Sequence, residues 1–181
     1  GISIGNLGFD NDDFEEKGRM IEGLPVLGSR KDIVDAYSNN MFDEIFLAAG
    51  YNNFEFRDNA FSELKGKVPF ANIIMPDAEL SETTSLGEGV FIGTKTYFGE
   101  NVRINDNVFI HGHTFISHDN IIGSHTYISG RLTTAGFENI GKRNFFGICA
   151  IVSDHISTCD DVWIGLGSIV AKKIKKPGRY V

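Results

Sequence analysis

Large apolar side chains recur at every sixth position over more than half of the chain. From residue 74 onward, fifteen of seventeen consecutive positions at this spacing are large and apolar. The positions are Ile74, Leu80, Leu86, Ile92, Phe98, Ile104, Ile110, Ile116, Ile122, Ile128, Thr134, Ile140, Phe146, Val152, Thr158, Ile164 and Val170. An α-helix turns about 100° per residue, so a stripe at this spacing drifts by about 240° each time and cannot stay on one side. Three short strands per coil can keep it there, which predicts a parallel β-helix with about 18 residues per coil and between five and six coils.

Two further patterns accompany the repeat. Small or β-branched residues stand mostly two positions before the apolar ones, so both point to the same inward face of a strand. Glycine directly follows several of the apolar positions, which indicates that a short strand ends there in a tight, often left-handed, turn. These glycines are Gly87, Gly93, Gly99, Gly123, Gly141, Gly147 and Gly165. An ordinary β-sandwich, the alternative, would not hold this register over so many repeats.

Residues 1–73 lack the repeat and alternate between strand and helix patterns. The expected elements are a strand over 21–28, a helix over 29–37, a strand over 44–49, a helix over 53–66 and a strand ending in Ile73–Met75. This order is typical of a Rossmann-like α/β domain with a parallel sheet. Residues 1–8 are too short for the opening strand, glycine-rich turn and helix, so the first βα unit looks missing. We therefore expect a mostly β chain: a small, apparently truncated α/β domain over 1–73 and the β-helix over 74–181.

Charge and composition exclude several classes of function. The chain has 17 Lys+Arg against 24 Asp+Glu, a net charge of −7, and no dense basic cluster, which argues against a nucleic-acid partner. No apolar run is long enough to span a membrane, and the N-terminal residues lack a secretory signal pattern. The two cysteines, Cys149 and Cys159, are too few for a disulfide scaffold and favour a reduced compartment. We expect a cytoplasmic protein.

Histidines gather on one part of the predicted β-helix. Four of the five fall within fifteen residues: His111, His113, His118 and His125. With 18 residues per coil, residues 18 apart stack at roughly 4.8 Å. One column then contains His118, Gly136, Asp154 and Lys172, and its neighbour contains Asp119, Phe137, His155 and Lys173. A histidine, then a residue without a side chain, then lysines would suit an extended thioester ligand with an anionic end.

The segments Ser117–Gly123, with its His-Asp pair, and Ile164–Lys172 resemble the left-handed β-helix (hexapeptide-repeat) sugar acetyltransferases. The most similar members are the sialic-acid O-acetyltransferase group with the bacillosamine-type and perosamine-type nucleotide-amino-sugar N-acetyltransferases. The resemblance implies acetyl transfer from acetyl-CoA to a nucleotide-linked sugar in surface-glycan biosynthesis. It also implies a homotrimer, with acetyl-CoA between neighbouring β-helices and no metal.

The resemblance assigns roles residue by residue. His118 would be the general base and Asp119 would hold its tautomer. Gly136 would offer a backbone N–H to the acetyl oxygen. The remaining assignments are Gly165, Gly167 and Ser168 along the cofactor groove with Asp154, Lys172 near the CoA phosphates, and Asp10 and Asp12 on the nucleotide base or ribose. Tyr127 stands where the family commonly has a second histidine that touches the acetyl carbonyl, whereas we expect His125 at the surface or an interface.

Three alternatives remain open at this point. A hydroxyl acceptor would use the same His-Asp pair, although the α/β domain favours N-acetylation of a nucleotide-linked amino-deoxy sugar. A γ-class carbonic anhydrase-like zinc enzyme would use His113 and His118, but position 77, where its first ligand is expected, is Asp77. A β-helix without catalytic activity would be an assembly scaffold.

Overall fold

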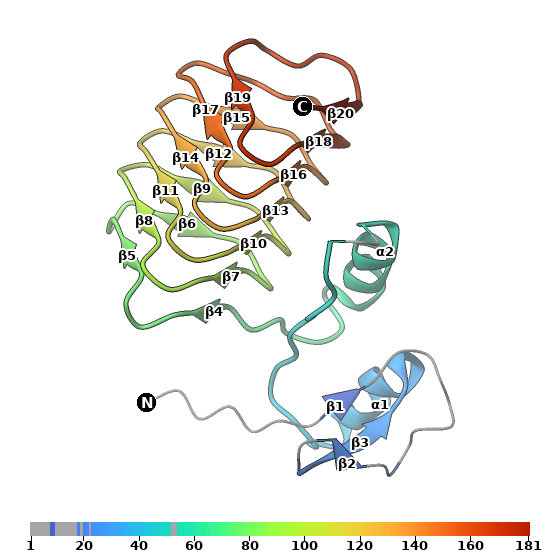
Figure 1. Ribbon diagram of the computed structural model, residues 1–181. Helices are drawn as coiled ribbons and strands as arrows, with labels where there is room; N and C mark the ends of the chain where they lie inside the picture. Colours follow the sequence, from blue (N-terminus) through green and yellow to red (C-terminus); the bar gives the residue numbers. More distant parts are fainter. Residues whose placement is uncertain (1–7, 10–17, 19, 22, 52–53) are drawn as a thin grey trace.

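The computed structural model describes residues 8–9, 18, 20–21, 23–51 and 54–181. From residue 73 to the C-terminus the backbone winds into a solenoid of triangular coils, with a small mixed unit and helix α2 beside its N-terminal end (Figure 1). Each coil contributes short strands to three parallel sheets, and pairing joins residues 18 apart, as in Ile110 with Ile128. The predicted parallel β-helix is confirmed.

The three sheets are named here in the order in which the chain enters them. Sheet 1 contains β4 (Ile73–Ile74), β7 (Phe91–Ile92), β10 (Phe109–Ile110), β13 (Tyr127–Ile128), β16 (Phe145–Phe146), β18 (Val162–Ile164) and β20 (Gly178–Tyr180). Sheet 2 contains β5 (Glu79–Leu80), β8 (Tyr97–Phe98), β11 (Phe115–Ile116), β14 (Thr133–Thr134), β17 (Ile151–Val152) and β19 (Ile169–Val170). Sheet 3 contains β6 (Ser85–Leu86), β9 (Arg103–Ile104), β12 (Ile121–Ile122) and β15 (Asn139–Ile140).

The apolar residues of the six-residue repeat fill the inside of the solenoid. Ile92, Ile110 and Ile128 have no exposed surface, and each fully buried side chain of this size contributes about 1.5–3 kcal/mol. The two threonines in the repeat are buried as well, because each hydroxyl is hydrogen-bonded. Thr134 Oγ1 accepts from Asn120 Nδ2 at 3.0 Å, and Thr158 Oγ1 accepts from the Gly141 N–H at 3.1 Å.

The turns correct the expected role of glycine. Left-handed backbone recurs at every sixth residue from 95 to 161, with φ between 51° and 63°, at twelve residues of which none is glycine. The glycines that follow the strands are needed instead for close approach of the next coil. A Cβ at Gly123 would lie 2.4 Å from the carbonyl carbon of Gly141, and one at Gly93 would lie 2.5 Å from the Gly112 nitrogen.

The N-terminal unit differs from the predicted one in three places. It consists of β1 (Gly8–Phe9), β2 (Met20–Ile21), β3 (Leu24–Gly28), a 3₁₀ turn (Arg30–Asp32), α1 (Ile33–Ser38) and α2 (Phe54–Leu64). The expected strand 21–28 is interrupted at Gly23, where φ is +82°, so β2 runs antiparallel to β3. Residues 44–49 form no strand apart from a bridge between Ile45 and Phe70. Ile73–Ile74 belongs to sheet 1 of the solenoid. The small sheet is therefore mixed, although β1 and β3 are parallel as expected.

Helix α2 packs on the corner between sheets 3 and 1 through buried polar groups. The guanidinium of Arg57 is buried and donates to the carbonyl oxygens of Ala49 and Asn107, each at 2.6 Å. His125 is buried too, with Nδ1 2.9 Å from Asn107 Nδ2 and Nε2 3.3 Å from Asp58 Oδ1. Burial lowers the pKa of His125 and lowers that of Arg57 to about 10. Of the surface and interface positions expected for His125, the surface position is wrong, because α2 covers the side chain.

Candidate active site

His118 and Asp119 occupy the corner between β11 and β12. Asp119 has a left-handed backbone, φ 57°, which aspartate tolerates better than most residues. Its Oδ2 lies 2.8 Å from His118 Nδ1, and its Oδ1 accepts from Asn101 Nδ2 at 3.1 Å. These two hydrogen bonds, that of His118 first, lower the pKa of the Asp119 carboxyl. An ionised Asp119 favours the tautomer with the proton on Nδ1, which leaves Nε2 of His118 as an acceptor.

The backbone of Gly136 lies against the His118 ring. A Cβ at position 136 would stand 2.7 Å from Cε1 and 2.9 Å from Nε2 of the imidazole. The predicted column is therefore confirmed at these two residues, and its glycine makes room for the ring. Among the described residues the Gly136 N–H has no hydrogen-bond partner. The side chain of His118 is 51% exposed, so part of the ring is open to solvent.

The neighbouring column, which contains Asp119, Phe137 and His155, adds two aromatic rings to the site. The Phe137 ring meets the His118 ring edge to face, with centroids 5.1 Å apart and an interplanar angle of 86°. It also stacks on the imidazole of His155 at 4.9 Å and 2°. The sequence placed Phe137 and His155 in this column but gave them no role. Asn101 was missed, although extending the same column downward by 18 residues leads from Asp119 to it.

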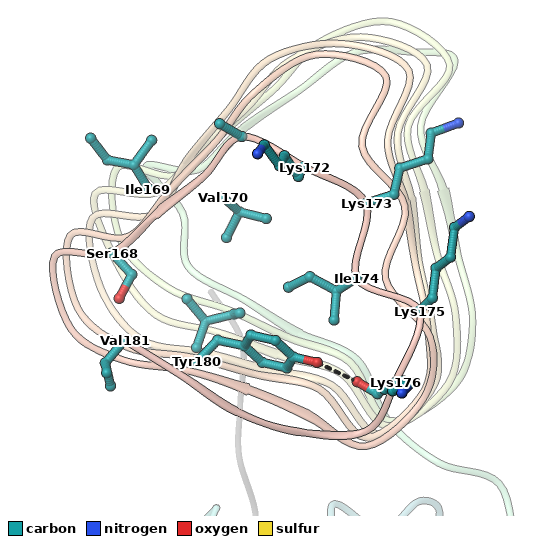
Figure 2. Close-up of a pocket in the computed structure, with 12 residues that line it drawn as sticks. Ser168, Ile169, Val170, Lys172, Lys173, Ile174, Lys175, Lys176, Tyr180 and Val181 are labelled. Atoms are coloured by element: carbon teal, nitrogen blue, oxygen red, sulfur yellow. Dashed lines mark hydrogen bonds between the residues drawn. The ribbon is translucent and has the colours of Figure 1, made fainter.

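Asp154 and Lys172 are exposed and continue the first column. Asp154 Oδ1 accepts from Ser153 Oγ at 3.0 Å, and Lys172 begins a run with four lysines in five residues. Figure 2 shows the hollow at the last coil, where Val170, Ile174 and Tyr180 point inside the ring of backbone and Lys173 and Lys175 point away from it. This hollow is the apolar end of the solenoid core rather than a site near His118.

The other predicted cofactor residues lie at a different corner of the same chain. Gly165, Gly167 and Ser168 form the turn between β18 in sheet 1 and β19 in sheet 2. His118 lies between sheets 2 and 3. The structure therefore divides the predicted cofactor groove between two corners that one chain does not bring together. Asp10 and Asp12, the expected nucleotide contacts, lie outside the described residues.

Tyr127 is not brought to His118 of its own chain either. It lies buried in β13, in a stack of aromatic rings that includes Phe109 at 5.7 Å and Phe145 at 5.9 Å. Its hydroxyl lies 2.5 Å from His111 Nε2. Burial raises the pKa of Tyr127 and lowers that of His111, so the phenol donates to a neutral imidazole.

The histidines and acidic side chains of the described residues bear on the zinc alternative. The described residues contain no group of three histidine, cysteine or acidic side chains arranged to hold a metal ion, and His113 lies at a different corner from His118. Within the same residues, no helix has the length and apolar character needed to cross a membrane.

The repeat of this chain is similar to that of known transferases. The family model "Bacterial transferase hexapeptide (six repeats)" matches residues 83–118. A UDP-3-O-acylglucosamine N-acyltransferase of Herminiimonas arsenicoxydans is 33% identical over 131 residues, 72% of this chain and 35% of that protein. The protein of the same name from Bordetella avium is 44% identical over 64 residues, 35% of this chain and 18% of that protein. The chain thus spans between about a fifth and a third of the length of these curated relatives.

Solved structures share the fold over most of the chain. PerB from Caulobacter crescentus, in complex with CoA and GDP-perosamine, matches with a TM-score of 0.78 and 23% identity, covering 88% of this chain and 76% of that one. The acetyltransferase domain of PglB from Neisseria gonorrhoeae, in complex with acetyl coenzyme A, matches with a TM-score of 0.80 and 21% identity, covering 88% and 77%. The hexapeptide repeat and the left-handed parallel β-helix are confirmed, and the chain shares its fold with these two structures.

Proposed function

We propose that this chain, which has the β-helix of the hexapeptide-repeat transferases, is an acetyl-CoA-dependent N-acetyltransferase acting on a nucleotide-linked amino-deoxy sugar. The observation that carries the proposal is the pair His118 and Asp119. Nδ1 of His118 is bound to an ionised carboxylate, and Nε2, which has no hydrogen-bond partner among the described residues, lies beside the backbone of Gly136. Such a pair is the arrangement of a general base held by a carboxylate.

The reaction uses this pair, the Gly136 N–H and the two substrates. Nε2 of His118 takes a proton from the acceptor amine as the amine nitrogen bonds to the thioester carbonyl carbon. The Gly136 N–H faces the carbonyl oxygen, whose negative charge grows in this step, and one such donor is worth about 3–4 kcal/mol. The carbon–sulfur bond then breaks, and the departing thiolate takes the proton from His118. The products are the N-acetyl sugar and free CoA.

The acceptor assignment draws on two kinds of support. The names of the relatives and of the structural neighbours state transfer to nitrogen where they specify it, which favours an amine over a hydroxyl. They differ in the sugar, because one group carries an acylglucosamine name and the other is bound to GDP-perosamine. An amino sugar linked to a nucleotide is the chemistry they have in common.

A homotrimer would bring the two corners with the predicted cofactor residues together, each from a different copy of the chain. The corner with His118 and the corner with Gly165 and Ser168 belong to different edges of one triangular solenoid. In a ring of three copies, the first corner of one chain faces the second corner of its neighbour, and heterologous contacts of this kind close at a threefold axis. The exposed outer side chains of sheet 2, Tyr97, Phe115 and Ile151, are the apolar surface available for such contacts. We further propose a cytoplasmic location, where acetyl-CoA and nucleotide sugars are available.

The test is thiol release from acetyl-CoA with UDP-, dTDP- and GDP-linked amino sugars, with the same nucleotides carrying hydroxy sugars as matched acceptors. We expect release with an amino sugar, a loss of at least 100-fold in His118→Ala, and CoA binding within about threefold of the original chain. Release with hydroxy sugars alone would overturn N-acetylation. If no acceptor supports release and the chain fails to bind CoA, the transferase assignment is wrong and a scaffold role takes its place.

A further inference from the structure

The phenyl ring of Phe137 stands beside His118 although local structure does not favour a phenylalanine there. Its backbone is left-handed, φ 60°, which is unfavourable for a residue with a Cβ. The eleven other non-glycine residues at equivalent turn positions between 95 and 161 are polar, charged or cysteine. The side chain is also half exposed, at 51%, so the ring gains little from burial. Neither conformation nor core packing accounts for a hydrocarbon side chain at this point.

The ring is nevertheless held in a defined position. It meets His118 edge to face at 5.1 Å and lies parallel to the His155 imidazole at 4.9 Å, and such aromatic pairs are worth more than their buried area alone. Phe137 directly follows Gly136, whose backbone lies against the base. The stacked pair therefore forms an aromatic wall that begins directly after Gly136.

The distances between base, nucleophile and carbonyl carbon in acyl transfer place the transferred group close to Phe137. The nucleophile must lie about 3 Å from Nε2 of His118, and the carbonyl carbon about 3–3.5 Å from the nucleophile. The carbonyl carbon then lies at most about 6–6.5 Å from Nε2, comparable with the 5.1 Å between the ring centroids of His118 and Phe137. We propose that Phe137, backed by His155, is the wall of the acyl pocket and restricts the transferred group to acetyl.

This inference rests on the proposed function and goes beyond it, because it assigns a residue to acyl-chain length. The relatives are named for acyl transfer and the structural neighbours for acetyl transfer, so the length of the chain is a real variable in this fold. Removing bulk from the wall should admit longer chains, and each methylene in an apolar pocket changes discrimination by about 10- to 200-fold.

The experiment measures kcat/KM with acetyl-, propanoyl-, butanoyl- and hexanoyl-CoA and the acceptor found in the assay above. In Phe137→Ala we expect the butanoyl-to-acetyl ratio to rise at least tenfold, with a smaller rise in Phe137→Leu. Met41→Ala is the matched control, because Met41 is also about half exposed, at 47%, but follows α1 in the N-terminal unit and lies at neither corner of the groove. Its ratio should stay within twofold of the original chain.

Several outcomes would overturn the proposal that Phe137 limits the length of the acyl chain. The ratio could stay within twofold in both Phe137 variants while their unfolding temperatures are preserved. The substitutions could change only the KM of the acceptor, which would place the ring against the sugar, or only the sedimentation of the protein, which would place it in a contact between copies. If the unsubstituted chain transfers acetyl and the Phe137 variants leave the butanoyl-to-acetyl ratio unchanged, only the role of Phe137 in chain length is refuted. A chain that transfers no acyl group refutes the proposed function as well.

Discussion

The imidazole of His118 and the backbone of Gly136 are in direct contact, so that a Cβ at position 136 would lie 2.7 Å from Cε1 of the ring. The two residues are 18 apart in the sequence and adjacent in space because the solenoid stacks them in successive coils. Position 136 therefore controls where the free nitrogen of the base points.

Gly136→Ala should damage activity far more than stability. The exposed His118 ring can swing away from the new methyl group at little cost, but it then loses its hydrogen bond to Asp119. We expect kcat/KM to fall about 100-fold, as for a misplaced catalytic group, with an unfolding temperature within about 2 °C of the original. Thiol-release kinetics and thermal unfolding measure the two effects. Gly50→Ala is the control, because a Cβ at this position would meet no atom within 4 Å. Equal losses in both variants would contradict the assignment.

Asn101 should act on the base through Asp119. Its amide donates to Asp119 Oδ1 and helps to hold the pKa of that carboxyl below its ordinary value. Asn101→Gly removes the side chain while permitting the left-handed backbone, φ 58°. Because the carboxylate then protonates more readily, the loss of activity on acidification should begin at a higher pH, with kcat/KM about tenfold lower at its maximum. A pH–rate profile that coincides with the original one would show that Asn101 has no part in positioning.

Glu138 should make stability depend on pH. It is 1% exposed, and burial raises the pKa of its carboxyl to about 9, so the folded chain keeps it neutral while the unfolded chain ionises it. Its contribution is fully present below the unfolded pKa and is lost as pH rises toward about 9, with a slope of up to about 1.4 kcal/mol per pH unit. Glu138→Gln cannot ionise, so its unfolding free energy should fall less steeply between pH 5 and 9. Denaturant unfolding of both proteins over this range provides the measurement, and parallel curves would refute the idea.

Sequence and structure agree best where the physics is local and periodic. The six-residue repeat predicts the coils, and the 18-residue stacking predicts the contact between His118 and Gly136, because each coil repeats the last. The strand predicted over residues 44–49 is absent, because this apolar run pairs with other backbone only at the bridge between Ile45 and Phe70. Agreement also fails at His125, since the sequence contains no sign that α2 would cover that corner.

The sequence by itself determined the solenoid, its register and the column that holds the candidate base, because a short period leaves only one way to bury the apolar stripe. Only the tertiary structure decided which side of each glycine is crowded and that Asn101 holds Asp119. It also decided that the rings of Phe137 and His118 meet edge to face and that Tyr127 is hydrogen-bonded to His111. Those relationships depend on side-chain directions and on contacts between coils, which a one-dimensional pattern does not specify.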